Sequence, residues 1–217
     1  LTAEPDLLIN SVATGYIRNS NDWALIDKHY ISIGQSISIS NLQLALAYCA
    51  IANGGKLLSP QLIEKIYKGN YVHYRDKYNI VREVLSPDVS KQILSTLENT
   101  VLEGTAKNLG LDHYKIAGKT GTAQKFDVNN NVYHDSLYVA SFASIFPSDN
   151  PKYVLLISID EPIYGSTENY QYASKSAIPA SRQVIAEMLN IDDELKQLCL
   201  KDDLFKYDEI AIKNETR

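Results

Sequence analysis

The sequence has few residues of the kinds that build metal or redox centres. It contains two cysteines, Cys49 and Cys199, which lie far apart and match no metal or redox spacing. The four histidines (29, 73, 113 and 134) also lack the spacing of metal ligands. We therefore expect neither a metal site nor a cofactor. Cys49 lies in an apolar stretch and is predicted to be an inert core thiol.

Clustered positive charge and long apolar runs are also missing. The net charge is −5 and no run of Lys or Arg occurs, which argues against nucleic acid as a partner. The longest apolar runs, Leu137–Pro147 and Tyr153–Ile159, are too short to span a bilayer. The chain opens at Leu1 without an initiator Met or a signal-like segment, so we expect it to be a piece of a longer protein. Any membrane anchor would then precede it.

The first half of the chain predicts one strongly apolar helix followed by extended segments. Asn41–Asn53 follows a capping serine (Ser38 or Ser40) and ends at two glycines, and it is apolar almost all round. We expect it to be a buried central helix. Leu57–Tyr67 and Tyr71–Val84 have partly alternating patterns typical of short strands. A second helix is predicted from Ser86-Pro87 to Gly104.

The second half predicts an antiparallel meander closed by a helix. Three β-rich runs joined by short polar turns cannot pair in parallel, because parallel pairing needs long crossovers; they are Tyr114–Phe126, Ser136–Phe146 and Lys152–Asp160. A final helix is expected over residues 173–190, with Pro179 in its first turns. The predicted fold class is α/β of the α+β type, an antiparallel sheet packed with helices. We expect one partial domain over residues 1–190 and a charged, solvated tail over 191–217.

Gly118-Lys119-Thr120-Gly121-Thr122 is the segment with the clearest chemical potential. On a strand, Thr120 and Thr122 share one face about 7 Å apart, so two hydroxyls can converge on one carboxylate. Gly121 leaves room for another backbone, and Lys119 adds a positive charge. Such a strand could bind an extended peptide by its terminal carboxylate. From these residues alone, an edge strand with no function explains the pattern equally well.

The block IAGKTGTAQK (Ile116–Lys125) resembles the third signature motif of the penicillin-binding transpeptidases. Four further blocks resemble that family in the right order, so that the likeness is strongest over residues 23–190. It is closest to the class B, division-type enzymes. The four blocks are Ser32–Ile66, the Gly104-Thr105-Ala106 element, Phe146–Pro162 and the helix that contains Ala177-Ile178-Pro179.

The resemblance implies acyl transfer on D-alanyl-D-alanine stem peptides of peptidoglycan, a chemistry that β-lactams intercept. It assigns Lys119, Thr120, Gly121 and Thr122 to substrate binding. Lys119 would bind the substrate carboxylate and sustain a positive field, and the two threonine hydroxyls would hydrogen-bond that carboxylate. The backbone N–H of Thr122 would be one of two oxyanion donors. The complete protein would stand at the periplasmic face of the bacterial inner membrane, with division proteins as candidate partners.

The nucleophile of that family is missing from this chain. No serine has a lysine three residues on, and the one Ser-x-Asn, Ser148-Asp149-Asn150, follows Lys119 instead of preceding it. Two prolines flank it, so we interpret it as a turn between strands. Ser36 occupies a place that the family usually gives to glycine. We therefore expect the nucleophile to come from a missing N-terminal half of the domain.

Three functional hypotheses remain open from the sequence. The chain is the C-terminal part of a D,D-transpeptidase, active only with its N-terminal half, or it is a degenerate, non-catalytic module that binds peptidoglycan or a partner protein. A serine β-lactamase is the third, and the division-type block Ser32–Ile66 argues against it. The isolated chain is predicted to be inactive by itself.

Overall fold

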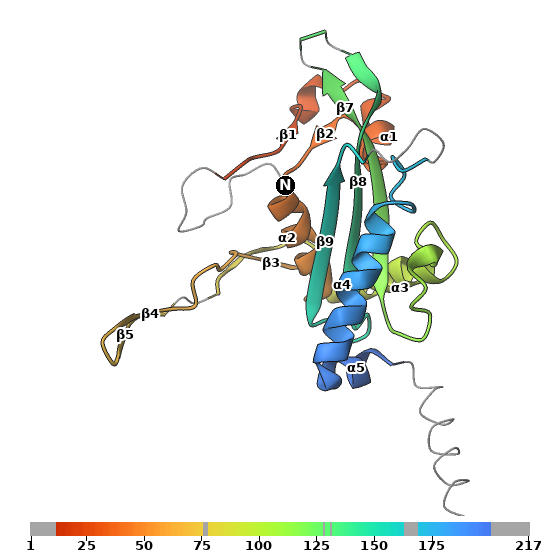
Figure 1. Ribbon diagram of the computed structural model, residues 1–217. Helices are drawn as coiled ribbons and strands as arrows, with labels where there is room; N and C mark the ends of the chain where they lie inside the picture. Colours follow the sequence, from red (N-terminus) through yellow and green to blue (C-terminus); the bar gives the residue numbers. More distant parts are fainter. Residues whose placement is uncertain (1–11, 76–77, 128, 131, 163–168, 201–217) are drawn as a thin grey trace, which may run out of the picture. The chain divides into compact units, whose positions relative to one another are not determined.

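The computed structural model describes residues 12–75, 78–127, 129–130, 132–162 and 169–200 (Figure 1). The chain divides into two compact units, Leu1–Ser90 and Lys91–Arg217. The mixture of helices with antiparallel strands confirms the predicted fold class. No described helix is long and apolar enough to cross a membrane.

The first unit contains short elements around one longer helix. Helix α2 (Asn41–Ala52) begins with a capping box, in which Ser40 Oγ accepts a hydrogen bond from the Gln43 N–H at 3.3 Å and Gln43 Oε1 accepts one from the Ser40 N–H at 2.9 Å. It ends before Gly54 and Gly55, both at positive φ. A Cβ on Gly55 would lie 2.0 Å from the Leu85 carbonyl oxygen, so that glycine permits the close approach of the two segments.

The prediction of a helix at residues 41–53 is confirmed, but its surroundings differ from what we expected. Only Gln43 and Ala50 of α2 are buried. The leucines at 42, 44 and 46 are half-buried. The described residues therefore do not cover this apolar helix on every side.

The other elements of the first unit form small two-stranded sheets. The strand pairs are all antiparallel: β1 (Tyr16–Ile17) with β2 (Ile37–Ser38), β3 (Lys56–Leu58) with β6 (Ile80–Glu83), and β4 (Lys65–Lys68) with β5 (Tyr71–Arg75). They confirm the extended segments expected over 57–84. The helical elements are η1 (Ser20–Asp22), α1 (Asp27–Ser32) and the start of α3 (Pro87–Leu102).

The second unit contains a three-stranded antiparallel sheet in the order β7-β8-β9, which confirms the predicted meander. Its strands are β7 (Ala117–Asp127), β8 (Val132–Phe146) and β9 (Tyr153–Asp160). The β7–β8 register pairs Lys119 with Ala143 and Thr120 with Phe142. Between β8 and β9 the Phe146–Pro147 bond is cis.

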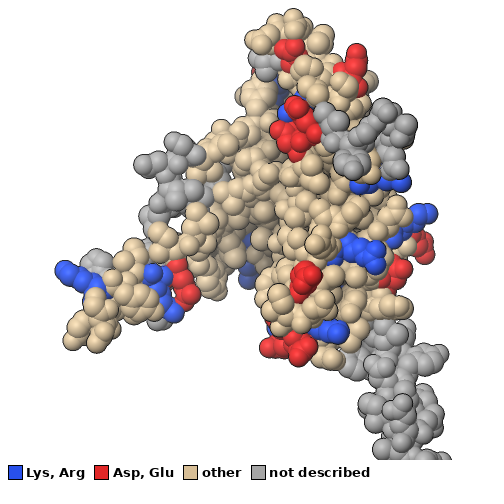
Figure 2. All heavy atoms as spheres, in the orientation of Figure 1, with Lys and Arg blue, Asp and Glu red and all other residues tan. Residues whose placement is uncertain are grey.

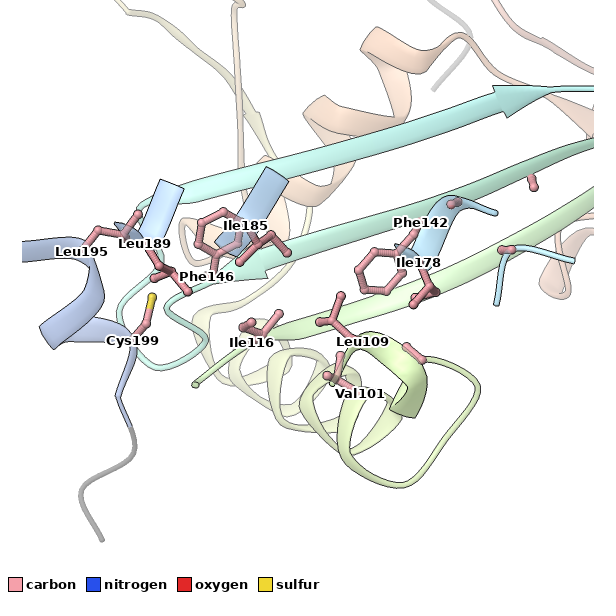
Figure 3. Close-up of a cluster of buried hydrophobic side chains, with 14 residues drawn as sticks. Val101, Leu109, Ile116, Phe142, Phe146, Ile178, Ile185, Leu189, Leu195 and Cys199 are labelled. Carbon is pink, nitrogen blue, oxygen red and sulfur yellow. The ribbon is translucent and has the colours of Figure 1, made fainter. Parts of the chain in front are cut away.

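Helix α4 (Ala177–Ile191) packs against β8 and β9 and against η2 (Lys107–Leu109) (Figure 1). One cluster of buried side chains joins this helix to the sheet and to the end of α3 (Figure 3). Phe142 and Phe146 of β8 lie at its centre, both completely buried. Pro179 stands in the first turn of α4, as predicted. This cluster therefore lies on one face of the sheet and consists of side chains from 101 onward. Ala117, Ala143 and Ile145, which belong to the opposite face, are buried as well.

The expectation of a solvated tail from residue 191 is wrong for its first residues. Asp192 caps helix α5 (Asp193–Cys199) by accepting a hydrogen bond from the Leu195 N–H at 2.9 Å. Leu195 and Cys199 are buried in the core cluster, because they lie one helical turn apart on the same face. Burial raises the pKa of the Cys199 thiol to about 11. Residues 201–217 lie outside the described part of the chain, and the domain division itself stays a prediction.

Candidate active site

The candidate site lies on β7, the edge strand of the sheet of the second unit. Alternation along the strand places Thr120 on the face that Phe142, its cross-strand partner, shares with the core. Thr122 shares this face and pairs with Ala140. Lys119 and Gly121 belong to the opposite face. The structure thus brings the four predicted site residues together, with the two hydroxyls on one face as expected.

Each hydroxyl of this strand has a protein partner that sequence reasoning missed. Thr120 Oγ1 lies 2.7 Å from Thr105 Oγ1, and Thr122 Oγ1 accepts a hydrogen bond from the Ala173 N–H at 3.3 Å. The element Gly104-Thr105-Ala106 was recognised only as a likeness to a family, with no role assigned to its hydroxyl. For Ala173 no signal exists in the sequence, because a backbone donor has no side-chain signature.

Lys119 is exposed, and its ammonium group donates a hydrogen bond to the Thr120 carbonyl oxygen at 2.9 Å. That bond links neighbours in the chain and leaves two of the three ammonium hydrogens for other acceptors. The charge of Lys119 therefore stands at the exposed edge of the sheet, on the strand that carries both hydroxyls but on the opposite face.

The glycines of the motif differ in what surrounds them. A Cβ on Gly118 would lie 2.5 Å from the Phe142 ring, inside the core, so this position requires glycine for packing. A Cβ on Gly121 would lie 2.6 Å from the hydroxyl oxygen of Ser141 on the next strand. The crowding atom at Gly121 is therefore the end of a small side chain of the same sheet. The sequence predicted room for a second backbone there and did not foresee this neighbour.

Two acidic residues at the end of β9 form ion pairs with another lysine of β7. Lys125 Nζ lies 2.7 Å from Asp160 Oδ1 and 2.6 Å from Glu161 Oε1. These two acids therefore form ion pairs within the sheet. The hydrogen bond that Lys125 donates to Asp160, and next the one that it donates to Glu161, raises the pKa of Lys125. Lys119 and Lys125 thus occupy one strand with different surroundings.

Ser148 has no surroundings suited to a nucleophile. Ser148 is 4% exposed, and its hydroxyl oxygen has no hydrogen-bond partner within the part of the chain that the structure describes. Its backbone N–H donates to the Lys115 carbonyl oxygen at 2.8 Å, within the turn predicted between β8 and β9. Among the described residues, no group of three or more His, Cys, Asp or Glu could hold a metal ion. On the face drawn in Figure 2, acidic and basic residues are interspersed.

Comparison with known proteins gives consistent matches along most of the chain. The family model described as penicillin binding protein transpeptidase domain matches residues 7–186. The peptidoglycan D,D-transpeptidase FtsI homolog of Mesostigma viride is 31% identical over 179 residues, 76% of this chain and 29% of its own length. The probable peptidoglycan D,D-transpeptidase PenA of Neisseria gonorrhoeae is 33% identical over 177 residues, 82% of this chain and 28% of its own length.

Solved structures give the same result at the level of the fold. Penicillin-binding protein 3 of Mycobacterium tuberculosis, complexed with ampicillin, is 25% identical with a TM-score of 0.74 over 88% of this chain and 42% of that chain. The transpeptidase domain of penicillin-binding protein 3 from Burkholderia pseudomallei is 31% identical with a TM-score of 0.65, over 84% of this chain and 53% of that chain. The chain therefore spans less than a third of the two curated relatives and about half of the solved chains.

Proposed function

Because the chain belongs to the penicillin-binding-protein transpeptidase domain family, we propose that it supplies the substrate-binding strand of a peptidoglycan D,D-transpeptidase. The nucleophilic serine comes from a part of the domain outside this sequence, since no Ser-x-x-Lys occurs in it. The complete protein acts in cell-wall cross-linking and division, at the periplasmic face of the inner membrane. Stem peptides are its substrates, and β-lactams bind to it in their place.

One observation carries this proposal: Lys119, Thr120 and Thr122 stand together on an edge strand. The outer edge of β7 has no neighbour among the described strands, so an extended peptide can add to it as a further strand. A terminal carboxylate placed at this edge is met by the two hydroxyls from one face of the strand and by the long Lys119 side chain from the other. These are the donors that recognise an ionised carboxylate most strongly, because a charge-assisted bond is stronger than a neutral one.

The chemistry is acyl transfer in two steps. The serine oxygen loses its proton and attacks the carbonyl carbon of the penultimate D-Ala, and the C–N bond breaks as terminal D-Ala leaves with a proton. The amine of a second stem peptide then attacks the resulting ester, which releases the serine and forms the cross-link. Within this chain, the Thr122 N–H acts as one oxyanion donor. Lys119 holds the substrate and stabilises negative charge.

The test compares two lysines of the same strand in the full-length protein that carries this segment. Lys119→Ala should reduce the second-order rate of acylation by a fluorescent penicillin about 10- to 100-fold, the range expected for one charge-assisted contact. Lys125→Ala should leave that rate unchanged, because Lys125 is paired with Asp160 and Glu161. The 217-residue chain alone should not be labelled.

Melting temperatures of both variants serve as the check on folding. Equal rates for Lys119→Ala and wild type would mean that the strand has no part in ligand binding. A full-length protein that no penicillin labels would refute acyl transfer altogether. Labelling of the isolated chain would show that a serine within it is the nucleophile.

A further inference from the structure

The Thr120 hydroxyl is in hydrogen-bonding contact with a second threonine. Thr105 lies in the turn between α3 and η2, and its hydroxyl oxygen is 2.7 Å from that of Thr120 on β7. The pair joins two segments 15 residues apart in the chain. Thr120 is half-buried and Thr105 is exposed, so both hydroxyls lie at the surface where a ligand of β7 would stand.

The backbone that holds Thr105 is anchored on both sides. The N–H groups of Gly104 and Ala106 both donate to the Thr100 carbonyl oxygen, at 3.1 Å and 3.3 Å. A Cβ on Gly104 would lie 2.8 Å from that same oxygen, so this tight return of the chain requires glycine. Ala106 is completely buried in the core cluster. The Thr105 hydroxyl is therefore presented from a fixed position.

The effect of the Thr105–Thr120 hydrogen bond depends on which of the two hydroxyls donates its single hydrogen. A threonine hydroxyl has one hydrogen to donate and two lone pairs that accept. Thr122 Oγ1 accepts from the Ala173 N–H, so its own hydrogen is left for a ligand. Thr120 is in the same condition only if Thr105 is the donor of the pair. A bound carboxylate favours that direction, because an ionised oxygen is a stronger acceptor than a hydroxyl.

We propose that Thr105 is a positioning residue of this site. It donates its hydroxyl hydrogen to Thr120 Oγ1, and it thereby fixes the Thr120 side chain and leaves the Thr120 hydrogen for the carboxylate of the substrate. This inference rests on the function proposed above. Thr105 itself does not contact the substrate. The Thr105 hydroxyl orients Thr120 in the same way as the Ala173 N–H orients Thr122.

The experiment compares benzylpenicillin with its methyl ester in the full-length protein. Thr105→Val keeps the shape of the side chain and removes the donor, so acylation by benzylpenicillin should fall about three- to tenfold, as expected for one hydrogen bond. Acylation by the ester should not change, because the ester has no ionised carboxylate to receive the Thr120 hydrogen. Thr105→Ser should retain the wild-type rates. Thr96→Val is the matched control, since the Thr96 hydroxyl donates within α3 to the Gln92 carbonyl oxygen at 2.9 Å.

The ratio of the two acylation rates does not depend on the folded fraction, so a destabilised Thr105→Val protein still gives an answer. A second comparison adds Thr105→Val to the Thr120→Val variant. The double variant should acylate with benzylpenicillin no more slowly than Thr120→Val alone. The proposal is overturned if Thr105→Val slows both compounds equally, if Thr105→Ser is as slow as Thr105→Val, or if the losses at 105 and 120 add. Failure of the proposed function has a different outcome, because neither compound would then acylate the wild-type protein.

Discussion

The two units of the chain differ sharply in how much apolar surface they bury. Among the described residues of the second unit, 17 apolar side chains besides Pro147 are buried between Val101 and Cys199, whereas in the described part of the first unit only Ala50 is. The first unit is not poorer in apolar residues, since α2 consists almost entirely of them. The difference is that helix α4 covers one face of the β7-β8-β9 sheet, while within its unit α2 packs on the short strand β3 and meets the start of α3, where the Ser90 hydroxyl donates to the Ile51 carbonyl oxygen.

This contrast shows which unit supports the candidate site with the larger core. The candidate strand β7 belongs to the unit with the larger core, so Lys119 and the threonines stand on a well-packed support. Half-buried leucines on α2 leave apolar surface in contact with water, which costs free energy in proportion to its area. We infer that α2 needs cover from beyond the described residues, as expected for a chain that spans less than a third of its curated relatives.

The largest effect is expected for the centre of the second unit. Phe142→Ala should lower the free energy of unfolding by about 3–5 kcal/mol, because a completely buried aromatic side chain leaves a cavity. Leu44→Ala on α2 should cost less, about 1–2 kcal/mol, because Leu44 is only partly buried. Urea unfolding followed by far-UV circular dichroism measures both changes.

Tryptophan fluorescence separates the units in the same experiment, because Trp23 is the only tryptophan and lies in the first unit. The fluorescence transition of Trp23 should come at lower urea than the main dichroism transition. Phe142→Ala should shift the dichroism transition far more than the fluorescence transition. A single shared transition, or equal losses at 44 and 142, would contradict the contrast between the units.

An intermediate effect is expected at the margin of the larger core. Leu195→Ala should cost about 2–3 kcal/mol, because Leu195 anchors helix α5 in the cluster around Leu189. Leu198→Ala on the same helix is the control and should cost about 1 kcal/mol or less, since Leu198 is half-buried. The same urea titration compares the two variants. Equal small losses would mean that α5 is no part of the core.

The smallest effect is expected in the first unit and has the opposite sign. Ser36 has φ 59°, in the left-handed region where residues with a Cβ are strained. Ser36→Gly should stabilise the first unit by about 0.5–1 kcal/mol, after allowing for the greater freedom of glycine in the unfolded chain.

Ser38→Gly in the extended strand β2 is the matched control, and it should destabilise by a similar amount. The shift of the Trp23 transition measures both variants. A loss of stability in Ser36→Gly would show that the serine side chain contributes a contact that outweighs the backbone strain.

Much of the fold could be predicted because its signals are local. Ser40 and Gln43 mark the start of α2 within four residues, and the polar turns between the β-rich runs predict the antiparallel sheet. The prediction for residues 191–200 was wrong because charge dominates that segment, and two apolar residues at helical spacing were too weak a signal to reveal α5.

The sequence by itself determined the order of the elements and the presence of lysine and threonine donors on one edge strand. It also anticipated that position 36 is unusual, but it could not give the sign of φ there. Tertiary structure decided which groups meet that strand: Thr105, Ser141 and the Ala173 N–H. The physical reason is distance along the chain, since the bond between Ala173 and Thr122 joins residues 51 apart. Local propensities act over a few residues, and only the packing of α4 and the turn after α3 against the sheet brings such groups within hydrogen-bonding distance.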